Sequence, residues 1–373
     1  MEKVDYVVIG GGMAGISVAS ELAAGASVIV VERETAPGYH TTGRSAALFS
    51  ETYGNATIRG LSMGGRGFYM APPDGFTESA MLSPRGALFI ARADQIAARD
   101  ALVADVDDAA RMDAIDAAAA CRHVPLLRRD YVAAAAYEPD AMDIDVNALL
   151  QGYIKQLRAR GGRLITDAEV RGLDLVAGAW HVDTAAGQFA APIVINAAGA
   201  WADTIGSLAG AAPIGLVPKR RTVIIFDPPA GTDTNKWPLT VDIDEEFYFK
   251  PDAGRLLGSP ADETPSEPCD AQPEELDIAI AVDRIETASE LKVRRVLSKW
   301  AGLRSFVSDK TPVAGFDGGR PGFFWLAGQG GYGIQTAPGL SRAAAALAGG
   351  RAMPADLQDF GVSESALSPG RLR

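Results

Sequence analysis

The chain has 373 residues, of which 47% are hydrophobic and 22% are charged. This balance is that of a folded globular protein, and it excludes a disordered, collagen-like or disulfide-scaffold chain. Subtracting 35 Lys and Arg from 47 Asp and Glu leaves a formal net charge of −12, so the average surface repels nucleic acids and anionic lipids. We therefore expect no nucleic-acid partner. The length predicts two domains, because single domains usually contain roughly 100 to 200 residues.

The cysteines and histidines give no sign of a metal or redox centre. Cys121 and Cys269 lie far apart in the sequence, which excludes a CxxC pair and a cysteine-rich zinc site. We expect both to be buried thiols. His40, His123 and His181 lack the HExxH and HxH spacings of metal sites, so we expect no metal.

The apolar stretch from Tyr6 to Val31 could be mistaken for a membrane span or a signal peptide. Five glycines and Glu21 interrupt it, and no basic segment or cleavage site frames it. We therefore expect a folded core segment of a cytoplasmic protein with no integral membrane segment.

The same stretch predicts a βαβ unit. Residues 4–9 are a β-branched apolar run, typical of a buried parallel strand, and residues 16–24 and 27–31 predict a helix and a second strand. The glycines between the first strand and the helix form a G-x-G-x-x-G motif at Gly10, Gly12 and Gly15. Such glycines allow a tight turn, the close approach of a pyrophosphate and close helix packing, while the helix N-terminus faces the anion.

Glu32 stands at the end of the second strand, 17 residues beyond Gly15. An acid at this place accepts hydrogen bonds from an adenosine ribose and disfavours a 2′-phosphate. The whole unit therefore predicts a dinucleotide site, and it leaves open whether the dinucleotide is FAD or NAD.

Later segments favour FAD. Residues 145–161 predict a helix, and residues 163–170 and 192–196 predict strands. Residues 323–327 predict a strand that meets a glycine-rich turn, followed by a helix over 334–347. A flavin ring, which becomes negative on reduction, gains from a helix N-terminus aimed at it, whereas an NAD site needs no second unit of this kind.

The middle of the chain predicts a second, substrate-facing domain. Residues 221–226, 245–250 and 255–258 read as antiparallel strands separated by Pro and Gly turns. In the strand over 245–250, the two-residue period places Tyr248 on the opposite face from its phenylalanine neighbours. Alanine-rich residues 95–121 predict a peripheral helical segment.

These elements predict an α/β (α+β) fold, in which a Rossmann-type FAD-binding domain is interleaved with a smaller substrate domain built on an antiparallel sheet. We expect residues 1–80, 145–213 and 312–373 in the first domain. Residues 81–144 and 214–311 make the second.

The motifs taken together resemble the D-amino-acid oxidase and dehydrogenase family of FAD enzymes, most closely its D-arginine dehydrogenases. The likeness covers nearly the whole chain. The matching stretches are Gly38 to Ala47, Leu127 to Asp145, Asn196 to Asp203, Pro218 to Arg221, Trp300 to Asp309 and Gly328 to Thr336.

The resemblance implies FAD-dependent oxidative deamination of a D-amino acid, with hydride transfer to the flavin and hydrolysis of the imino acid to a keto acid and ammonia. It implies six catalytic residues: Tyr53, Arg221, Tyr248, Arg304, Gly331 and Gln335. Arg221 and Arg304 would clamp the substrate carboxylate, which a guanidinium holds with two parallel hydrogen bonds. From the residues alone, Arg221 could equally belong to a solvated basic cluster with Lys219 and Arg220.

In the same family the FAD would be held by residues of the glycine motif, the second strand end, the 42–47 segment and the C-terminal glycine turn. The expected set is Gly10, Gly12, Met13, Ala14, Gly15, Glu32, Arg33, Thr42, Gly43, Arg44, Ser45, Ala47, Val170, Ala198, Gly199, Gly328, Gly330, Gly331, Tyr332, Gly333, Ile334, Gln335 and Thr336.

The pattern departs from D-arginine dehydrogenases in the substrate pocket. Ala87 stands where they have a glutamate for the substrate guanidinium, and Leu48 replaces a histidine. An unpaired buried cation costs several kcal/mol, so we expect neutral or apolar D-amino acids to be better substrates than D-arginine and D-lysine. Glu51, on the same segment as Leu48, could supply a replacement charge.

Two alternatives stay open. The same clamp and flavin would serve the oxidation of a 2-hydroxy acid or an N-methyl amino acid, and the fold could also serve a non-catalytic FAD-binding scaffold. The resemblance favours a quinone or dye-type electron acceptor over oxygen.

Overall fold

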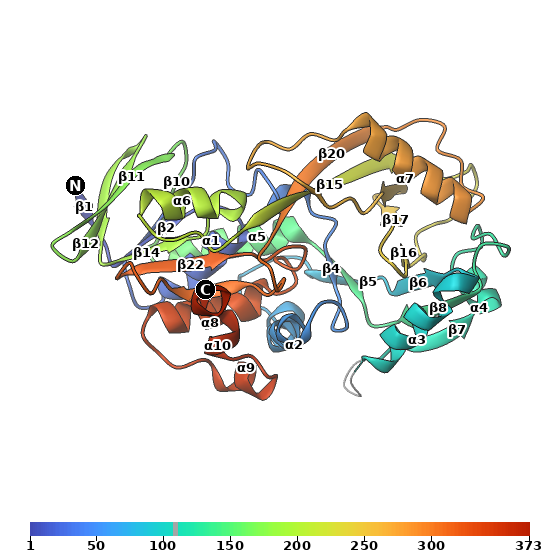
Figure 1. Ribbon diagram of the computed structural model, residues 1–373, viewed down its shortest axis with the longest axis horizontal. Helices are drawn as coiled ribbons and strands as arrows, with labels where there is room; N and C mark the ends of the chain where they lie inside the picture. The colour runs from blue at the N-terminus through green and yellow to red at the C-terminus, as the bar shows by residue number, and fades with distance from the viewer. Residues whose placement is uncertain (107–110) are drawn as a thin grey trace.

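The computed structural model describes residues 1–106 and 111–373, which form two halves that lie side by side (Figure 1). One half is built on a six-stranded sheet and the other on a nine-stranded sheet. β15 (Val217–Phe226) and β20 (Ser298–Phe306) reach across the middle of the molecule and join them (Figure 1). Within the described ranges, we find no helix long and apolar enough to cross a bilayer.

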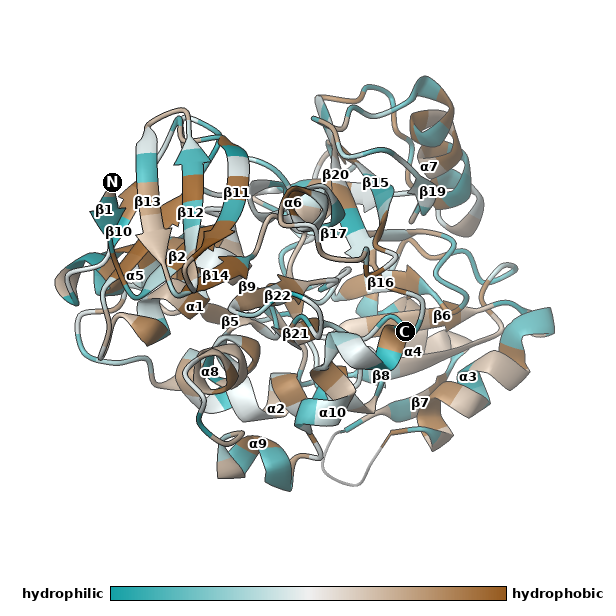
Figure 2. Ribbon diagram, turned by 60° about the vertical axis from the view of Figure 1, so that its left-hand side comes forward, coloured by the Kyte–Doolittle hydropathy of each residue, from teal (hydrophilic) through white to brown (hydrophobic). Residues whose placement is uncertain are grey.

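The six-stranded sheet has a hydrophobic run in each central strand. Its order is β10 (Arg163–Ile165), β3 (Val28–Val31), β2 (Tyr6–Ile9), β14 (Ile193–Asn196), β22 (Phe323–Ala327) and β21 (Val313–Phe316), with all pairs parallel except β21 with β22. Parallel strands covered on both faces need apolar side chains on both faces. The hydrophobic colour of β2, β14 and β22 in Figure 2 follows from this burial.

Alternate residues of these strands enter two different cores. Val8 packs with helices α1 (Met13–Leu22), α5 (Val146–Ala159) and α8 (Ala337–Ala348) on one face. Val7 faces the other side, where α6 (Ala202–Leu208) and a small sheet cover it. The small sheet consists of β1 (Glu2–Lys3), β13 (Gly187–Ala191), β12 (Ala179–Thr184) and β11 (Val170–Val176).

The second half is a mainly antiparallel sheet. In order, its strands are β19 (Thr264–Pro265), β15, β18 (Arg255–Ser259), β17 (Tyr248–Asp252), β16 (Leu239–Asp242), β6 (Ala87–Ala91), β8 (Ala134–Glu138) and β7 (Asp113–Asp116), with β20 also paired to β15. Phe247 and Phe249 are fully buried in the core that includes residues of α7 (Glu275–Ala288), whereas Tyr248 packs with the opposite cluster. The alternation predicted for Phe247, Tyr248 and Phe249 is confirmed, although the strand begins at Tyr248 and not at residue 245.

The remaining elements join the halves and cover parts of both sheets. They are β4 (Leu48–Phe49), β9 (Met142–Ile144) and β5 (Leu82–Pro84), which form a three-stranded sheet, and helices α2 (Ala56–Met70), α3 (Ile96–Ala104), α4 (Ala117–His123), α9 (Ala355–Asp359) and α10 (Glu364–Leu367).

The predicted fold class, a mostly parallel sheet interleaved with an antiparallel substrate-domain sheet, is confirmed. All strands of the six-stranded sheet come from residues 1–80, 145–213 and 312–373, and all strands of the nine-stranded sheet come from 81–144 and 214–311. We propose these ranges as the two domains.

Two predicted elements were wrong in extent. The strand over 163–170 is interrupted, because the chain leaves the six-stranded sheet after Ile165 and enters the small sheet at Val170. Residues 95–121 are not continuously helical, since Asp113–Asp116 pairs with β8 as an edge strand between α3 and α4. Residues 107–110 of that prediction lie outside the described residues.

Three further details differ. The first helix, α1, begins at Met13 and not at residue 16. The helix predicted over 334–347, which is α8, begins at Ala337 and not at residue 334. This helix starts later because Pro338, which has no N–H to donate within a helix, is favoured in the first turn of a helix. Cys121 is buried as expected, but Cys269 is exposed, because it lies in an irregular segment between β19 and α7.

Candidate active site

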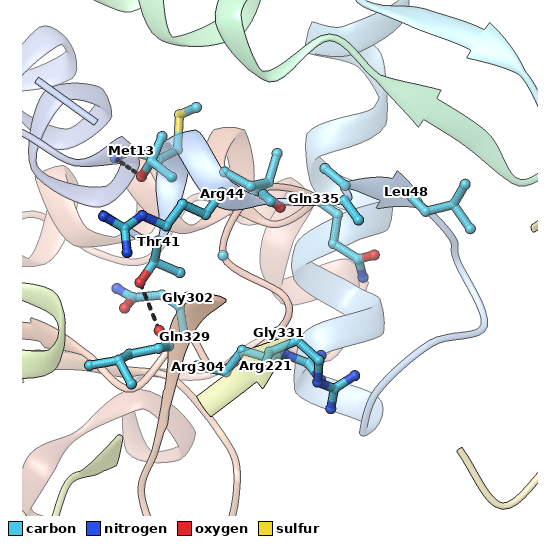
Figure 3. Close-up of a pocket in the computed structure, with 18 of the residues that line it drawn as sticks. Met13, Thr41, Arg44, Leu48, Arg221, Gly302, Arg304, Gln329, Gly331 and Gln335 are labelled. Atoms are coloured by element: carbon cyan, nitrogen blue, oxygen red, sulfur yellow. Dashed lines mark hydrogen bonds between the residues drawn. The ribbon is translucent and has the colours of Figure 1, made fainter. Parts of the chain in front are cut away.

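A pocket lies where the two sheets meet (Figure 3). It is lined by the start of α1, by residues 41–48, by β15 and β20, and by the glycine turn over 329–335. These segments come from both halves of the molecule, so the pocket exists only in the folded chain.

The glycine motif forms one end of the pocket. Gly10 has a φ of 111° and lies against the carbonyl of Ala197, so a side chain there would be strained and would clash. Gly15 packs on the carbonyl of Gly10, where a Cβ would also overlap. Gly12 lines the pocket, and the backbone N–H of Met13 donates to Thr42 Oγ1 at 3.0 Å. The N-terminus of α1 thus opens toward the cavity, as anion binding requires.

Glu32 ends β3 beside this motif and is buried. Its carboxylate accepts hydrogen bonds from Gly11 N at 2.5 Å and from Glu34 N at 2.9 Å. Next to it the Arg33 guanidinium stacks 4.8 Å from the ring centre of Trp201. The backbone bonds point the carboxylate toward the glycine turn, where a ribose hydroxyl would be recognised.

The segment over 41–48 fastens the glycine-motif side to β20. Thr41 Oγ1 donates to the carbonyl of Leu303 at 2.7 Å (Figure 3). Arg44 donates to the carbonyl of Ala301 at 2.9 Å, and Trp300 Nε1 donates to the carbonyl of Arg44 at 3.1 Å. These bonds hold the two halves in a fixed relation along one wall of the pocket.

Arg304 is the central cation of the site. Its Nη2 donates to the hydroxyl of Tyr53 at 3.1 Å, while its Nη1 is buried and has no hydrogen-bond partner in the described part of the chain. Burial alone would lower the pKa of Arg304, but its interaction with Tyr53 raises it above the ordinary value, so the group stays cationic. Buried polar atoms are nearly always paired, so the unpaired nitrogen indicates a place for a ligand oxygen.

Arg221 extends beside Arg304 (Figure 3). Its Nε donates to the carbonyl of Asp262 at 2.9 Å, and its Nη2 lies 3.4 Å from Glu263 Oε1. The ring centre of Tyr248 lies 5.9 Å from the Arg221 guanidinium carbon. The interpretation of Arg221 as part of a solvated cluster was wrong, because its side chain is only 10% exposed and lines the pocket, whereas Arg220 forms ion pairs with Glu274 and Asp277.

The glycine turn over 328–333 lies against the Arg304 guanidinium. A Cβ on Gly331 would overlap the Arg304 guanidinium, so only glycine allows this approach. Gln335 lines the pocket, but its side-chain amide is turned to Ser62, to whose Oγ it donates at 2.9 Å. The buried atoms Ser305 Oγ and Gln329 Nε2 have no hydrogen-bond partner among the described residues.

The far wall of the pocket is apolar. Leu48, Phe89, Leu239 and Val241 line it. Ala87, the register partner of Leu239 on the neighbouring strand β6, is fully buried. No charged side chain of β6 or β16 is among the lining residues in the described ranges.

Two carboxylates near this wall are tied elsewhere. Glu51 lies outside the lining and pairs with Arg66, at 3.4 Å. Glu138, the register partner of Ala87 on β8, is buried under the segment that carries Tyr53. It accepts hydrogen bonds at 2.8 Å from both Ser50 Oγ and Thr52 Oγ1.

The structure brings all six predicted catalytic residues to the pocket. Of the predicted cofactor residues, those that line it are Gly12, Met13, Ala14, Thr42, Arg44, Ser45, Ala47, Gly199, Gly330, Gly331, Gly333, Ile334 and Gln335. Those outside the lining are Gly10, Gly15, Glu32, Arg33, Gly43, Val170, Ala198, Gly328, Tyr332 and Thr336. One of these, Tyr332, packs against a lining residue, with its ring centre 4.9 Å from that of Tyr53.

Sequence reasoning missed Glu263, Ser305 and Gln329. Glu263 lies 3.4 Å from Arg221 and 3.9 Å from Arg304. The only signal for Gln329 was its place within the glycine turn, and nothing in the sequence pattern marks Ser305 or Glu263. The contacts of Glu263 with the two arginines depend on how β15, β19 and β20 pair.

The residues present fit FAD. The glycine turn and α1 N-terminus would hold a pyrophosphate, Glu32 a ribose, and the turn over 328–333 an approaching flavin ring. The unpaired Ser305 Oγ and Gln329 Nε2 add polar atoms that the protein itself leaves without partners. Bound FAD would supply a two-electron acceptor, and the guanidinium groups of Arg221 and Arg304 and the phenols of Tyr53 and Tyr248, which line the pocket, would position what is oxidised.

Comparison with known proteins agrees with this arrangement. Residues 5–347 match the family model described as FAD dependent oxidoreductase, DAO. FAD-dependent oxidoreductase domain-containing protein 1 from Bos taurus is 25% identical over 93% of this chain and 81% of its own length. Mitochondrial dimethylglycine dehydrogenase from Mus musculus is 25% identical over 58% of this chain and 27% of its own length.

Among solved structures, glycine oxidase from Geobacillus kaustophilus superposes with a TM-score of 0.81 at 20% identity, covering 94% of this chain and 96% of its own. L-proline dehydrogenase from P. horikoshii superposes with a TM-score of 0.82 at 21% identity, covering 99% and 98%. The chain belongs to the DAO family of FAD-dependent oxidoreductases, and its cofactor is FAD.

Proposed function

We propose that this protein oxidatively deaminates D-amino acids with neutral or apolar side chains, giving an imino acid that water hydrolyses to a 2-keto acid and ammonia. The observation that carries the proposal is the buried, unpaired Nη1 of Arg304 beside Arg221. A substrate carboxylate would supply the missing acceptor, and two guanidinium groups would hold it with directional, charge-assisted bonds.

The side chains around the clamp support orientation and not covalent chemistry. Arg304 and Arg221 would bind the carboxylate, and Tyr53 would close over it from its bond to Arg304. Burial raises the pKa of Tyr332, which keeps this phenol neutral beside the ring of Tyr53. With the carboxylate fixed, the Cα–H bond of the substrate is held in one direction, which is the main contribution a protein makes to such a reaction.

The proposed preference for neutral or apolar side chains rests on the far wall. Leu48, Phe89, Leu239 and Val241 offer apolar contacts, and Ala87 supplies no counter-charge. Glu51 pairs with Arg66 outside the lining, so it offers a substrate cation no contact there. A guanidinium or ammonium side chain would be desolvated against this wall, where no lining side chain of β6 or β16 in the described ranges carries a counter-charge, and the carboxylate of Glu245, which also lines the pocket, is exposed to solvent.

The relatives support an amino-acid-type substrate, since their names include glycine oxidase, L-proline dehydrogenase and dimethylglycine dehydrogenase. The D configuration rests on the motif resemblance alone. A second candidate is the oxidation of an N-methyl amino acid, which the partial likeness to dimethylglycine dehydrogenase favours. Both candidates use the same carboxylate clamp.

The test is anaerobic mixing of the FAD-loaded protein with a substrate panel, followed through loss of oxidised-flavin absorbance. The panel pairs D- and L-forms of methionine, phenylalanine, leucine and arginine, and adds sarcosine and D-lactate. We expect bleaching by neutral D-amino acids with a higher kcat/KM than by D-arginine. Preference for D-arginine or for L-forms contradicts the substrate proposal, preference for sarcosine or lactate selects an alternative, and no bleaching by any compound favours a non-catalytic scaffold.

The same preparation tests the electron acceptor. We propose a quinone or dye-type acceptor in place of oxygen. Reduced protein mixed with oxygen or with a quinone analogue should be reoxidised faster by the quinone, and the reverse order would identify an oxidase.

A further inference from the structure

Glu263 lies among three cations at the carboxylate clamp. Its Oε2 accepts from Lys219 Nζ at 2.8 Å, and its Oε1 lies 3.4 Å from Arg221 Nη2 and 3.9 Å from Arg304 Nη1. Its side chain is 32% exposed and lies outside the residues that line the pocket, within ion-pair range of the lining residues Arg221 and Arg304.

Strand pairing puts the three cations together. Lys219 and Arg221 are two residues apart on β15, and therefore share a face of the sheet. Lys219 is also the register partner of Arg304 on the antiparallel strand β20, which places Arg304 on that face too. Glu263 directly precedes β19, whose Thr264 pairs with Arg220, so its carboxylate reaches the same three side chains.

The two carboxylate oxygens of Glu263 have different partners. One oxygen is fully engaged by Lys219, and the other is within ion-pair range of both arginines. At 3.9 Å it does not hydrogen-bond Arg304, whose Nη1 keeps its N–H groups free to donate to another acceptor. Arg304 therefore has N–H groups left to donate to one further carboxylate.

Glu263 is an anion in this setting. Burial alone would raise its pKa, but the hydrogen bond from Lys219 and the charges of the two arginines lower it below the ordinary value. The net charge at the clamp is +2, since Glu263 neutralises one of the three cations Lys219, Arg221 and Arg304. Glu245, an exposed residue that lines the same pocket, offsets part of the remainder through solvent.

We propose that Glu263 is a specificity-determining residue that reserves the clamp for substrates with a single carboxylate. It does so by occupying Lys219, the third cation, which would otherwise pair with a second substrate carboxylate. It also presents a like charge to any such group. The inference rests on the proposed function, since it assumes that the substrate carboxylate binds at Arg304 and Arg221.

The experiment uses two unreactive probes of equal length, the monocarboxylate butyrate and the dicarboxylate succinate. Their Kd values are measured on the FAD-loaded protein from the perturbation of the oxidised-flavin spectrum. In Glu263→Gln, which removes the charge and keeps the shape, we expect the ratio of butyrate Kd to succinate Kd to rise by at least about tenfold over wild type, as the loss of a like-charge contact implies.

Three further variants make the result specific. Glu263→Asp keeps the charge and should keep the wild-type ratio to within a few-fold. Lys219→Met in the Glu263→Gln background should reduce the gain, because the second carboxylate then has no cation to meet and only the lost repulsion by Glu263 remains. Glu267→Gln changes an exposed acid in the same segment and should leave the ratio unchanged.

A Glu263→Gln ratio that changes less than about tenfold, or a gain that loss of Lys219 does not reduce, overturns the proposal. Equal tightening of both probes overturns it as well, because the carboxylate would then act as a general repulsion and not as a selector. Failure of butyrate to bind wild-type protein would overturn both this inference and the carboxylate clamp, whereas butyrate binding with an unchanged ratio overturns this inference alone.

Discussion

The guanidinium of Arg304 lies so close to the Cα of Gly331 that a single methyl group on the glycine would overlap it. The C-terminal glycine turn is therefore part of the clamp and not only a flexible connection. Gly331 sits at a place where backbone from one half of the molecule meets a charged side chain from the other half. The clamp depends on the absence of a side chain as much as on the presence of the arginine.

Gly331→Ala should displace Arg304 without removing any functional group. We expect the variant to retain FAD and to lose about 10- to 100-fold in kcat/KM, because a displacement of about 1 Å in a positioning residue has effects of this size. Steady-state kinetics and the flavin-to-protein absorbance ratio measure the two quantities. Gly67→Ala, at an exposed position of α2 where the new methyl meets nothing within 4 Å, is the matched control. Unchanged kcat/KM in Gly331→Ala would contradict the role of this contact.

Arg304→Ala should keep its flavin and lose amino-acid turnover. We expect a cost of roughly 2 to 5 kcal/mol in kcat/KM, because one partner of a buried charge pair is removed. Arg304→Lys should recover little of it, since an ammonium cannot reproduce the planar two-point contact. Arg220→Ala, on the opposite face of β15, loses ion pairs with Glu274 and Asp277 and should lower the Tm while leaving kcat/KM near wild type. If Arg304→Ala turned over substrate normally, Arg304 would not belong to the site.

Tyr53→Phe should weaken substrate binding by a modest amount. The change removes the hydroxyl that accepts from Arg304 Nη2 at 3.1 Å, and a bond of this kind contributes about 0.5 to 1.5 kcal/mol. We expect KM to rise more than kcat falls. Tyr131→Phe is the control, because it removes a similar hydrogen bond, from Arg92 Nη1 to the Tyr131 hydroxyl at 3.2 Å, outside the pocket lining. It should leave both constants unchanged. Equal effects of the two substitutions would mean that the Tyr53 bond serves stability only.

Glu138→Gln should change how stability depends on pH. Burial raises the pKa of Glu138 above its ordinary value of 4.5, although its bonds to Ser50 and Thr52 oppose this. The folded state therefore binds the proton more readily than the unfolded state, and the stability that this provides is present below the ordinary pKa and lost as the pH rises through the folded value.

The Tm of wild type minus that of Glu138→Gln should accordingly be larger near about pH 4 than near about pH 8. Thermal unfolding at both values measures the difference, in which the other titrating groups cancel. The exposed Glu290→Gln serves as control. A Tm difference that grows with rising pH would show that Glu138 is stabilised as an anion and would contradict its raised pKa.

Local patterns in the sequence determined much of this protein. The glycine motif with its flanking strands predicted the parallel sheet and the turn at Gly10, and the two-residue period placed Tyr248 away from Phe247. Such patterns are reliable because strand and helix periods act over a few residues, and because a positive φ or a close backbone approach admits only glycine. The motif resemblance added the six residues that line the pocket.

Only the tertiary structure decided which charges share the clamp. The composition and spacing of residues 217–221 could not tell Arg220, which points to α7, from Arg221, which points to the pocket. Glu263 lies 42 residues beyond Arg221 and 41 before Arg304, and it meets both because β19 and β20 pair on the same strand. Glu138 faces Ala87 for a similar reason, through register between β6 and β8. Register is set by hydrophobic burial and turn geometry over the whole sheet, so no short window of sequence contains it.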